Sequence, residues 1–301
     1  MKASVIIPTL NEARLLPGLL DRLERQTFRD FEVIVADAGS TDGTRELCRA
    51  RGVILTDGGM PAVGRNAGAA LARGERLFFF DADVLPPEDF LAKANAEMDR
   101  GGMRLATCWF VPDSDHPLDH LLFELANQFV RLSLRTDPHA GGFAIFVDRA
   151  IFEQVGGFDE TLKLAEDHDL VKRAARHAPL NMLESTQIRM SVRRLVKDGR
   201  FNYSAKCIQV ELHRLFKGEV TEDIVDYGFG YDESSRGDGA GMDETLRRLV
   251  ERVDELRRDH TATLRRLSKE VKGAPEVQEA MAEIRAKFDS LKEAVRSYLM
   301  R

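Results

Sequence analysis

Arg76-Leu-Phe-Phe-Phe-Asp-Ala-Asp83 is an apolar run that passes directly into two carboxylates one residue apart. A short apolar run bounded by polar residues is typical of a buried strand. Carboxylates at the end of such a strand can point into a cleft, and two so close repel each other unless they share a cation. Taken alone, the triplet is explained equally well by an acidic turn and by a metal site.

The residues before this run alternate between strand-like and helix-like stretches. Residues 3–7, 31–36 and 53–55 are short apolar runs, and leucines at helical spacing follow the first of them. Strand followed by helix, repeated in this way, predicts parallel βαβ units. The expected fold class is α/β, with a mixed, mostly parallel sheet flanked by helices. Other helices are expected over 44–51, 66–73, 118–132, 149–155 and 167–177, and another strand over 141–147.

Polar clusters follow three of the predicted strands, at residues 8–12, 37–43 and 81–83. Ligands of parallel sheets bind beyond the carboxyl ends of the strands, so three clusters on one rim predict one site. Alternatives stay open for each cluster. Asn11 and Glu12 suit either a helix cap or contacts to a base and ribose, and the glycine-rich residues 37–43 suit either a plain turn or a close approach to a ligand.

Arg65 follows a glycine at an expected helix start, which suits either a diphosphate or solvent. His116, His120, His139 and His168 lack a convincing spacing for metal ligands and are expected to be surface or hydrogen-bonded residues.

The overall composition sets limits on the class of protein. The chain has 301 residues, 43% of them hydrophobic, and a net charge of -6, which argues against a nucleic-acid-binding surface. Three scattered cysteines predict no disulfide framework, and a reducing cytoplasm is the expected setting. No apolar run approaches the ~20 residues needed to span a bilayer. Peripheral contact with the inner face of the membrane stays open.

The last quarter of the chain differs from the rest. A glycine-rich linker is expected over 237–245, after a catalytic domain over 1–236. Apolar residues at heptad-like spacing then predict an α-helical hairpin or coiled coil over 246–301. Such an appendage could bind a partner or join copies of the chain into a homo-oligomer.

Seven short blocks, taken in order, resemble the signature of glycosyltransferase family 2, which has the Rossmann-like GT-A fold. They are SVIIPTLNE (4–12), VIVADAGSTDGT (33–44), GRNAG (64–68), FFFDAD (78–83), GGFAIF (141–146), GGFDE (156–160) and EDHDL (166–170). Each block is weak alone, but their shared order and spacing over about residues 3–175 make the resemblance specific.

The resemblance implies roles for individual residues. It puts Asp37 on the base, Arg65 near the diphosphate, Asp81 toward ribose or metal, and Asp83 on Mn²⁺ or Mg²⁺. The resemblance places Pro8, Thr9, Glu12, Asp37, Ser40, Asp42, Arg65 and Asp81 in the nucleotide-sugar-binding set. The candidate set also includes Asn11, Ala82, Arg193 and Arg194, which the residues themselves suggest. Gly141 and Gly142 would border the acceptor and donor sugar, and Glu166-Asp167 would supply the catalytic base, with Asp167 preferred. The alternative is a purely structural role, because negatively charged side chains are stabilised at a helix N-terminus by the helix dipole.

Two departures from the family pattern qualify the resemblance. The usual Asp-Asp-Gly-Ser reads Asp37-Ala-Gly-Ser40, so a carboxylate is lost at position 38. The Gln-x-x-Arg-Trp motif of processive synthases is absent, which favours single additions. Ser191, Arg193 and Arg194 instead suit a basic element that closes over the diphosphate, or a solvated strand end.

The implied function is an inverting, metal-dependent hexosyltransferase that uses a nucleotide diphosphate sugar, UDP first among the nucleotides. The acceptor is a glycan, a lipid-linked molecule or a small molecule, with glycan or cell-envelope polysaccharide synthesis as the expected setting. Two alternatives stay open: transfer to a polyprenyl phosphate at the membrane surface, and a non-catalytic nucleotide-binding scaffold.

Overall fold

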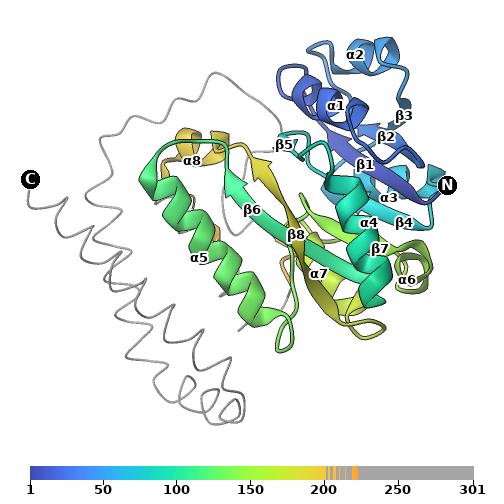
Figure 1. Cartoon of the computed structure of the whole chain (residues 1–301). Coiled ribbons are helices and arrows are strands. Elements are labelled where there is room, and N and C mark those ends of the chain that lie inside the picture. Colours follow the sequence, from blue (N-terminus) through green and yellow to red (C-terminus); the bar gives the residue numbers. More distant parts are fainter. Residues whose placement is uncertain (201–202, 204–205, 208–209, 211–213, 215–218, 223–301) are drawn as a thin grey trace, which may run out of the picture.

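The computed structural model describes residues 1–200, 203, 206–207, 210, 214 and 219–222 (Figure 1). The predicted linker over 237–245 and the helical hairpin over 246–301 lie outside the described residues, as does any role of the hairpin in self-association. Within the described part of the chain, no helix is both long and apolar enough to cross a membrane.

The described residues form one eight-stranded mixed sheet in the order β3-β2-β1-β4-β7-β6-β8-β5. Its strands are β1 Ala3–Thr9, β2 Phe31–Asp37, β3 Ile54–Asp57, β4 Arg76–Phe79, β5 Val84–Leu85, β6 Leu105–Pro112, β7 Ile145–Asp148 and β8 Leu180–Met190. The first four in the order are parallel, β6 and β8 are also parallel, and β7 and β5 run antiparallel to their neighbours. The predicted α/β class with a mixed sheet is confirmed.

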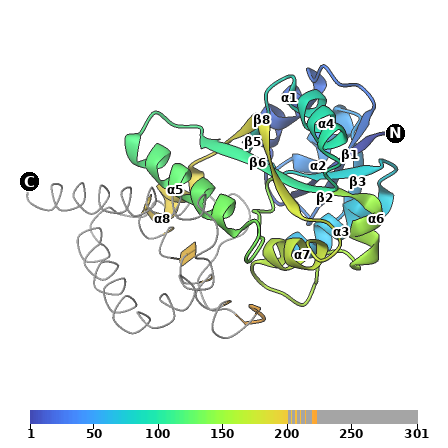
Figure 2. The same cartoon turned by 60° about the horizontal axis from the view of Figure 1, so that its bottom comes forward.

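Helices cover both faces of the sheet, with α1 and α4 on one side and α3, α6 and α7 on the other (Figure 2). The helices are α1 Leu16–Glu24, α2 Thr44–Ala50, α3 Pro61–Leu71, α4 Phe90–Gly101, α5 Pro117–Ser133, α6 Arg149–Gln154, α7 Glu166–Ala174 and α8 Arg193–Asp198. Helix α5 packs against β6, and α8 follows the end of β8 (Figure 1).

Two predicted boundaries were wrong. Helix α3 begins at Pro61 rather than at residue 66, because proline suits the first turn of a helix. Gly64 and Arg65 therefore lie inside the helix and not at its start. The strand expected over 141–147 is instead the shorter β7, Ile145–Asp148, so Gly141 and Gly142 lie in the loop before it.

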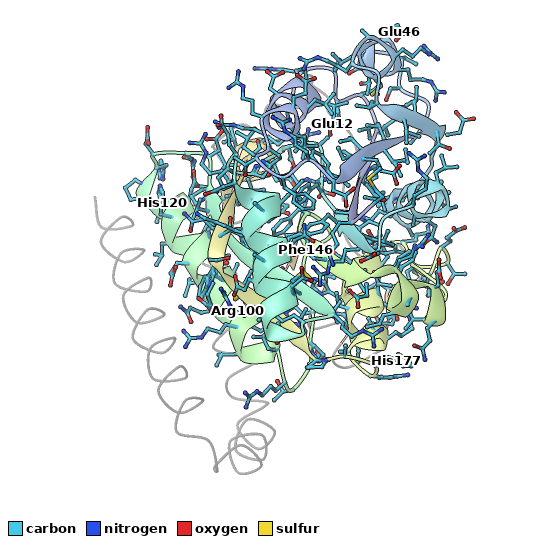
Figure 3. All side chains as sticks on the ribbon, turned by 45° about the vertical axis from the view of Figure 1, so that its right-hand side comes forward. Glu12, Glu46, Arg100, His120, Phe146 and His177 are labelled. Carbon is cyan, nitrogen blue, oxygen red and sulfur yellow. The ribbon has the colours of Figure 1, made fainter. Side chains whose placement is uncertain are left out.

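The three phenylalanines of the opening sequence run supply both halves of the core. Side chains alternate across a strand, so Phe78 and Phe80 point to one face and Phe79 to the other. Phe146 of β7 lies 4.9 Å from Phe78 and 6.0 Å from Phe80, ring centroid to centroid, in the interior of the molecule (Figure 3). On the opposite face, Phe79 packs 5.1 Å from Phe158 in edge-to-face geometry. The strand that presents the acidic triplet is thus anchored on both sides.

Helix α3 approaches β1 closely because Gly68 has no side chain. A Cβ at this position would lie 2.5 Å from Cγ2 of the buried Ile6. The close approach places the N-terminal half of α3, with Arg65, beside the end of β1.

We expect Gly68→Ala to lower the free energy of unfolding by about 1–3 kcal/mol, because the added methyl group overpacks the helix–sheet contact. Urea denaturation followed by circular dichroism measures the change. The matched control is Gly18→Ala in α1, where the nearest atom is Leu85 Cδ2 at 3.3 Å. This control should be neutral, or more stable by up to about 1 kcal/mol from helix propensity. Equal effects at the two positions would contradict the packing argument.

Candidate active site

The strand order reverses between β1 and β4, and the candidate site lies at this point. From β1 the chain moves outward through β2 to β3, and it then returns to place β4 on the other side of β1. The crevice beyond the carboxyl ends at such a reversal is where α/β sheets bind ligands. Three predicted clusters meet there, since Thr9 pairs in register with Asp37 and Phe80 donates its backbone N–H to Ile6.

The loops after β1 and β2 are joined by hydrogen bonds between the side chain of one loop and the backbone of the other. The Asn11 N–H donates to Ser40 Oγ at 2.7 Å, and the Thr41 N–H donates to Asn11 Oδ1 at 2.9 Å. Asp42 Oδ2 accepts from the Ala13 N–H at 2.9 Å. Asn11 has a φ of 53°, a left-handed conformation that asparagine tolerates. Asn11, Ser40 and Asp42, which were predicted to bind nucleotide, therefore hold the two loops in one shape.

Asp37 is the centre of this loop pair. Its carboxylate accepts from Thr9 Oγ1 at 3.1 Å and from both the N–H and the hydroxyl of Ser40, and its side chain is 0% exposed. Arg45 Nη1 completes the set at 3.2 Å. Burial works against the ionised form, but these hydrogen bonds hold the pKa of Asp37 below its ordinary value. A base could reach this carboxylate only by replacing Arg45 or another of its present partners.

Glu12 and Asp83 share one arginine. Arg193 Nη1 and Nη2 lie 2.7 and 2.6 Å from the two carboxylate oxygens of Glu12, and Arg193 Nε lies 2.9 Å from Asp83 Oδ2. Both carboxylates are more than nine-tenths buried. Burial raises the pKa of Glu12 and of Asp83, while the guanidinium opposes that rise. The Arg194 charge also lowers the pKa of Asp83.

A second arginine joins the acidic triplet to the Glu166-Asp167 pair. Arg65 Nη2 lies 2.9 Å from Asp81 Oδ1, and Arg65 Nη1 lies 2.6 Å from Glu166 Oε1. Burial opposes the charge of Arg65, but Asp81 and Glu166 raise the pKa of its guanidinium. Gly142 makes room for this arginine, because a Cβ there would lie 2.2 Å from Arg65 Nη2. Arg65 is thus a buried bridge from the end of β4 to the start of α7.

The two members of the acidic pair have different surroundings. Glu166 is buried in its ion pair with Arg65, and burial followed by the Asp167 charge raises its pKa. Asp167 keeps 18% of its side chain exposed. Asp167 Oδ2 accepts from the Gly142 N–H at 2.6 Å, which fixes the carboxylate at the edge of the site. Asp167 is therefore the more exposed member of the pair.

His168, next to Asp167, is held in one tautomer by Arg214. Arg214 Nη1 lies 2.8 Å from His168 Nδ1, and a guanidinium can only donate, so Nδ1 accepts and Nε2 carries the proton. His168 Nε2 lies 3.9 Å from Asp167 Oδ1, and the ring stacks on His139 at 4.8 Å between centroids. By contrast, His120 lies at the periphery of the molecule (Figure 3).

The site has more carboxylates than arginines. Among the described residues, Arg193 pairs with Glu12 and Asp83, and Arg65 pairs with Asp81 and Glu166. The charge of Arg194 also acts on Asp83, so the five carboxylates of Glu12, Asp81, Asp83, Glu166 and Asp167 outnumber these three arginines. Among the described residues, however, no three His, Cys, Asp or Glu side chains are grouped so as to hold a metal ion. The residues therefore fit a divalent cation that brings phosphate oxygens as further ligands, rather than one enclosed by protein groups alone.

The structure brings together most of the residues predicted from the sequence, and it adds three. Pro8, Ala82 and Gly141 lie in the same loops and strand ends as the residues described above, and Arg194 lies beside Arg193 in α8. The additions are Arg45 on Asp37, Thr44, whose hydroxyl accepts from the Glu12 N–H at 2.9 Å, and Arg214 on His168. Thr44 is the last residue of the block over 33–44, but that block does not show that its hydroxyl binds the Glu12 N–H. No sequence signal marks Arg45 or Arg214, since each is an ordinary arginine whose role depends on its partner in the fold.

The fold and site define an α/β protein with an acidic, arginine-bridged cluster of side chains at a switch point of its sheet. The sequence model of Glycosyl transferase family 2 matches residues 4–153. The chain belongs to glycosyltransferase family 2, as the seven blocks predicted.

Two relatives show how far the similarity extends. Validoxylamine A glucosyltransferase of Streptomyces hygroscopicus is 38% identical over 135 residues, which are 40% of this chain and 32% of that protein. A PGL/p-HBAD biosynthesis glycosyltransferase of Mycobacterium bovis is 32% identical over 184 residues, which are 55% of this chain and 66% of that protein. The matched part thus spans less than two thirds of either relative.

Solved structures share the fold. The mannosyltransferase PcManGT of Pyrobaculum calidifontis, in complex with GDP-Man and Mn²⁺, has a TM-score of 0.53 at 25% identity and covers 69% of this chain and 64% of its own. TarS 1–349 of S. aureus, in complex with UDP, has a TM-score of 0.53 at 22% identity and covers 96% of this chain and 80% of its own. The GT-A fold expected from the sequence is confirmed.

We expect Arg65→Gln to lower the free energy of unfolding by about 3–5 kcal/mol at pH 8, because it leaves Glu166 buried without its cation. Burial already raises the pKa of Glu166, and the substitution should raise it further. The folded variant then binds a proton that the unfolded chain releases, so its stability falls as pH rises. The cost of the substitution should therefore be smaller at pH 5 than at pH 8.

Urea denaturation of both proteins at the two pH values measures this cost. The control is Arg49→Gln, which removes an exposed arginine paired with Glu46 within one helix and should cost less than about 1 kcal/mol. An Arg65→Gln cost that does not change with pH would show that Glu166 is not the group left unpaired.

Proposed function

We propose that this protein is an inverting glycosyltransferase that moves a sugar from a nucleotide diphosphate sugar to a hydroxyl group of an acceptor. The observation that supports it most is the Arg65 bridge, which joins the acidic triplet at the end of β4 to the Glu166-Asp167 pair. The carboxylates proposed to bind the cation and to accept the proton would thereby lie close together. The family membership supports the same reaction class.

The donor is proposed to lie over the ends of β1, β2 and β4. Pro8, Thr9 and the loop pair held by Asp37 would form the nucleoside pocket, and Arg193 and Arg194 would face the diphosphate. UDP is the first candidate nucleotide and GDP the second, because TarS has been solved with UDP-GlcNAc and PcManGT with GDP-Man. Neither the sugar nor the acceptor follows from these residues.

A divalent cation is proposed to enter with the donor, since the carboxylates of the site exceed its arginines. Asp83 and Asp81 would hold it together with diphosphate oxygens. Mn²⁺ or Mg²⁺ would supply positive charge against the negative charge that develops on the departing diphosphate. Mn²⁺ is present in the PcManGT complex, which supports its use as the first ion to test.

Asp167 is proposed to act as the general base. Its carboxylate would take the proton of the acceptor hydroxyl while that oxygen attacks the anomeric carbon. The bond between this carbon and the diphosphate oxygen breaks with its electron pair leaving on the diphosphate, so the configuration inverts. Glu166 is already paired with Arg65 and would hold α7 and Asp167 in place. Gly142, which donates its N–H to Asp167, would border the acceptor and donor sugar.

We expect Asp167→Asn to reduce turnover at least a hundredfold while leaving nucleotide affinity within a factor of three, because general base catalysis typically contributes about 10²–10⁴-fold. The measurement is release of UDP or GDP from a panel of donors and acceptors, alongside calorimetric binding of the same nucleotide. Glu153→Gln, an exposed acid-to-amide change on α6, is the matched control. Turnover that survives in Asp167→Asn would require another base.

We expect Asp83→Asn to abolish the extra thermal stabilisation that Mn²⁺ and UDP produce together, because the cation loses its carboxylate ligand. Thermal shift with Mn²⁺ and UDP, each alone and combined, and then with GDP, measures this. The control Asp89→Asn changes an exposed aspartate paired with Lys93 and should behave as the unmodified protein. An unchanged response in Asp83→Asn would contradict the assignment of the cation to this residue. No stabilisation of the unmodified protein by any combination would favour the scaffold alternative instead.

A further inference from the structure

The guanidinium of Arg193 stands between two buried carboxylates at the place proposed for the cation. It makes two contacts of 2.6 and 2.7 Å with Glu12 and one of 2.9 Å with Asp83 Oδ2. The side chain of Arg193 is 17% exposed, against 6% for Glu12 and 9% for Asp83. This paired arginine therefore neutralises carboxylate charge that a divalent ion would otherwise neutralise.

The position of Arg193 is set by the fold and not by a chance side-chain contact. Strand β8 pairs with β5 through Val84 and Met190, directly after Asp83 in the chain. The Ser191 N–H donates to the backbone carbonyl of Asp83 at 3.1 Å, and Ser191 Oγ accepts from the Arg193 N–H at 3.2 Å. The turn that carries Arg193 is thus hydrogen-bonded to the residue that the arginine neutralises.

A cation on Asp83 Oδ2 and the present position of Arg193 exclude each other. A divalent ion such as Mg²⁺ lies about 2.1 Å from a carboxylate oxygen, and Arg193 Nε already lies 2.9 Å from Asp83 Oδ2. Two positive groups on one oxygen repel strongly in a site from which water is largely removed. The guanidinium must leave Oδ2 before an ion can bind that oxygen, and an ion on Oδ1 would still be repelled by the charge of the guanidinium.

A diphosphate offers the displaced arginine another partner. Phosphate oxygens accept hydrogen bonds from a guanidinium as carboxylate oxygens do, so the N–H that now lies on Asp83 has an alternative acceptor. The carboxylate of Glu12 would keep Arg193 near the site while the arginine turns from Asp83 to the phosphate.

We propose that Arg193 acts as the resident counterion of Asp83, so that a divalent cation binds tightly only together with a nucleotide diphosphate, which draws the guanidinium away. This proposal rests on the proposed function, because it concerns the same donor site. Binding of cation and diphosphate is then coupled, and by linkage each tightens the other by the same factor. Arg193 is a positioning and gating residue in this scheme.

The experiment measures Mn²⁺ binding to the full chain without nucleotide, from the electron paramagnetic resonance signal of free Mn²⁺. We expect Arg193→Gln to bind Mn²⁺ at least tenfold more tightly than the unmodified protein. The double variant Arg193→Gln with Asp83→Asn should lose this gain, which assigns the ion to Asp83. The control is Arg189→Gln on β8, whose arginine is 50% exposed and pairs with Asp113, and it should leave Mn²⁺ affinity unchanged.

A second measurement follows UDP binding at saturating Mn²⁺ by calorimetry. Arg193→Gln should bind UDP at least threefold more weakly, because the diphosphate loses its arginine, and the coupling between Mn²⁺ and UDP should shrink. Arg193→Lys keeps the charge but lacks the three separate nitrogens with which Arg193 contacts both oxygens of Glu12 and Asp83 Oδ2. Its Mn²⁺ affinity without nucleotide should lie between those of the unmodified protein and Arg193→Gln. If Arg193→Gln fails to fold, the Mn²⁺ affinity of Arg193→Lys tests the counterion role in its place.

The outcomes separate this proposal from the proposed function. Mn²⁺ affinity that rises in neither Arg193 variant would overturn the counterion role, even if the unmodified protein binds UDP and transfers sugar. Failure of the unmodified protein to bind UDP or GDP with Mn²⁺ would overturn the proposed donor site itself.

Discussion

Arg65 makes the interaction on which the arrangement of the site depends. It enters from the middle of α3, and its two terminal nitrogens lie on carboxylates from separate parts of the chain. Two independent features place it there: the missing side chain of Gly68 lets α3 approach β1, and that of Gly142 leaves room for the guanidinium. A buried charge needs such partners, because an unpaired one costs several kcal/mol, of the order of 3–5. The acidic triplet and the Glu166-Asp167 pair are consequently kept together without a ligand.

The loops that follow β1 and β2 are likewise held together by contacts within the protein. Most of their polar side chains satisfy one another or the neighbouring backbone, and Asp37 has no exposed side-chain surface. These residues therefore fix the shape of the two loops, and few of their polar groups remain to contact a ligand in the proposed nucleoside pocket. Pre-organised loops lower the entropy lost when a ligand is bound, so a residue can matter to binding while touching no ligand. Substitution of Ser40 or Asp42 would then act through the loop geometry.

The two arginines of the crevice have unequal freedom. Arg65 is 5% exposed and is paired with acids from two elements, whereas Arg193 lies on the short helix α8 and is partly exposed. The first is suited to a constant structural role and the second to a change of partner. Separation of these roles would allow a site with a surplus of carboxylates to remain folded and still accept the cation of the proposed function. The distinction rests on burial and on the supporting element, since the two side chains are chemically identical.

The sequence by itself determined the fold class and the location of the site. Apolar runs of strand length alternate with helical stripes, and the clusters at 8–12, 37–43 and 81–83 follow strands whose carboxyl ends must share a rim. It also indicated the family, because the seven short blocks keep their order. It could not show that Arg193 reaches Glu12 and Asp83, or that Arg65 lies within α3 and bridges Asp81 to Glu166. Those contacts join residues that only the crossing order of the strands brings together, and local periodicity carries no information about that order. Whether a carboxylate near the site faces a ligand or is paired with an arginine was therefore decided by the tertiary structure alone.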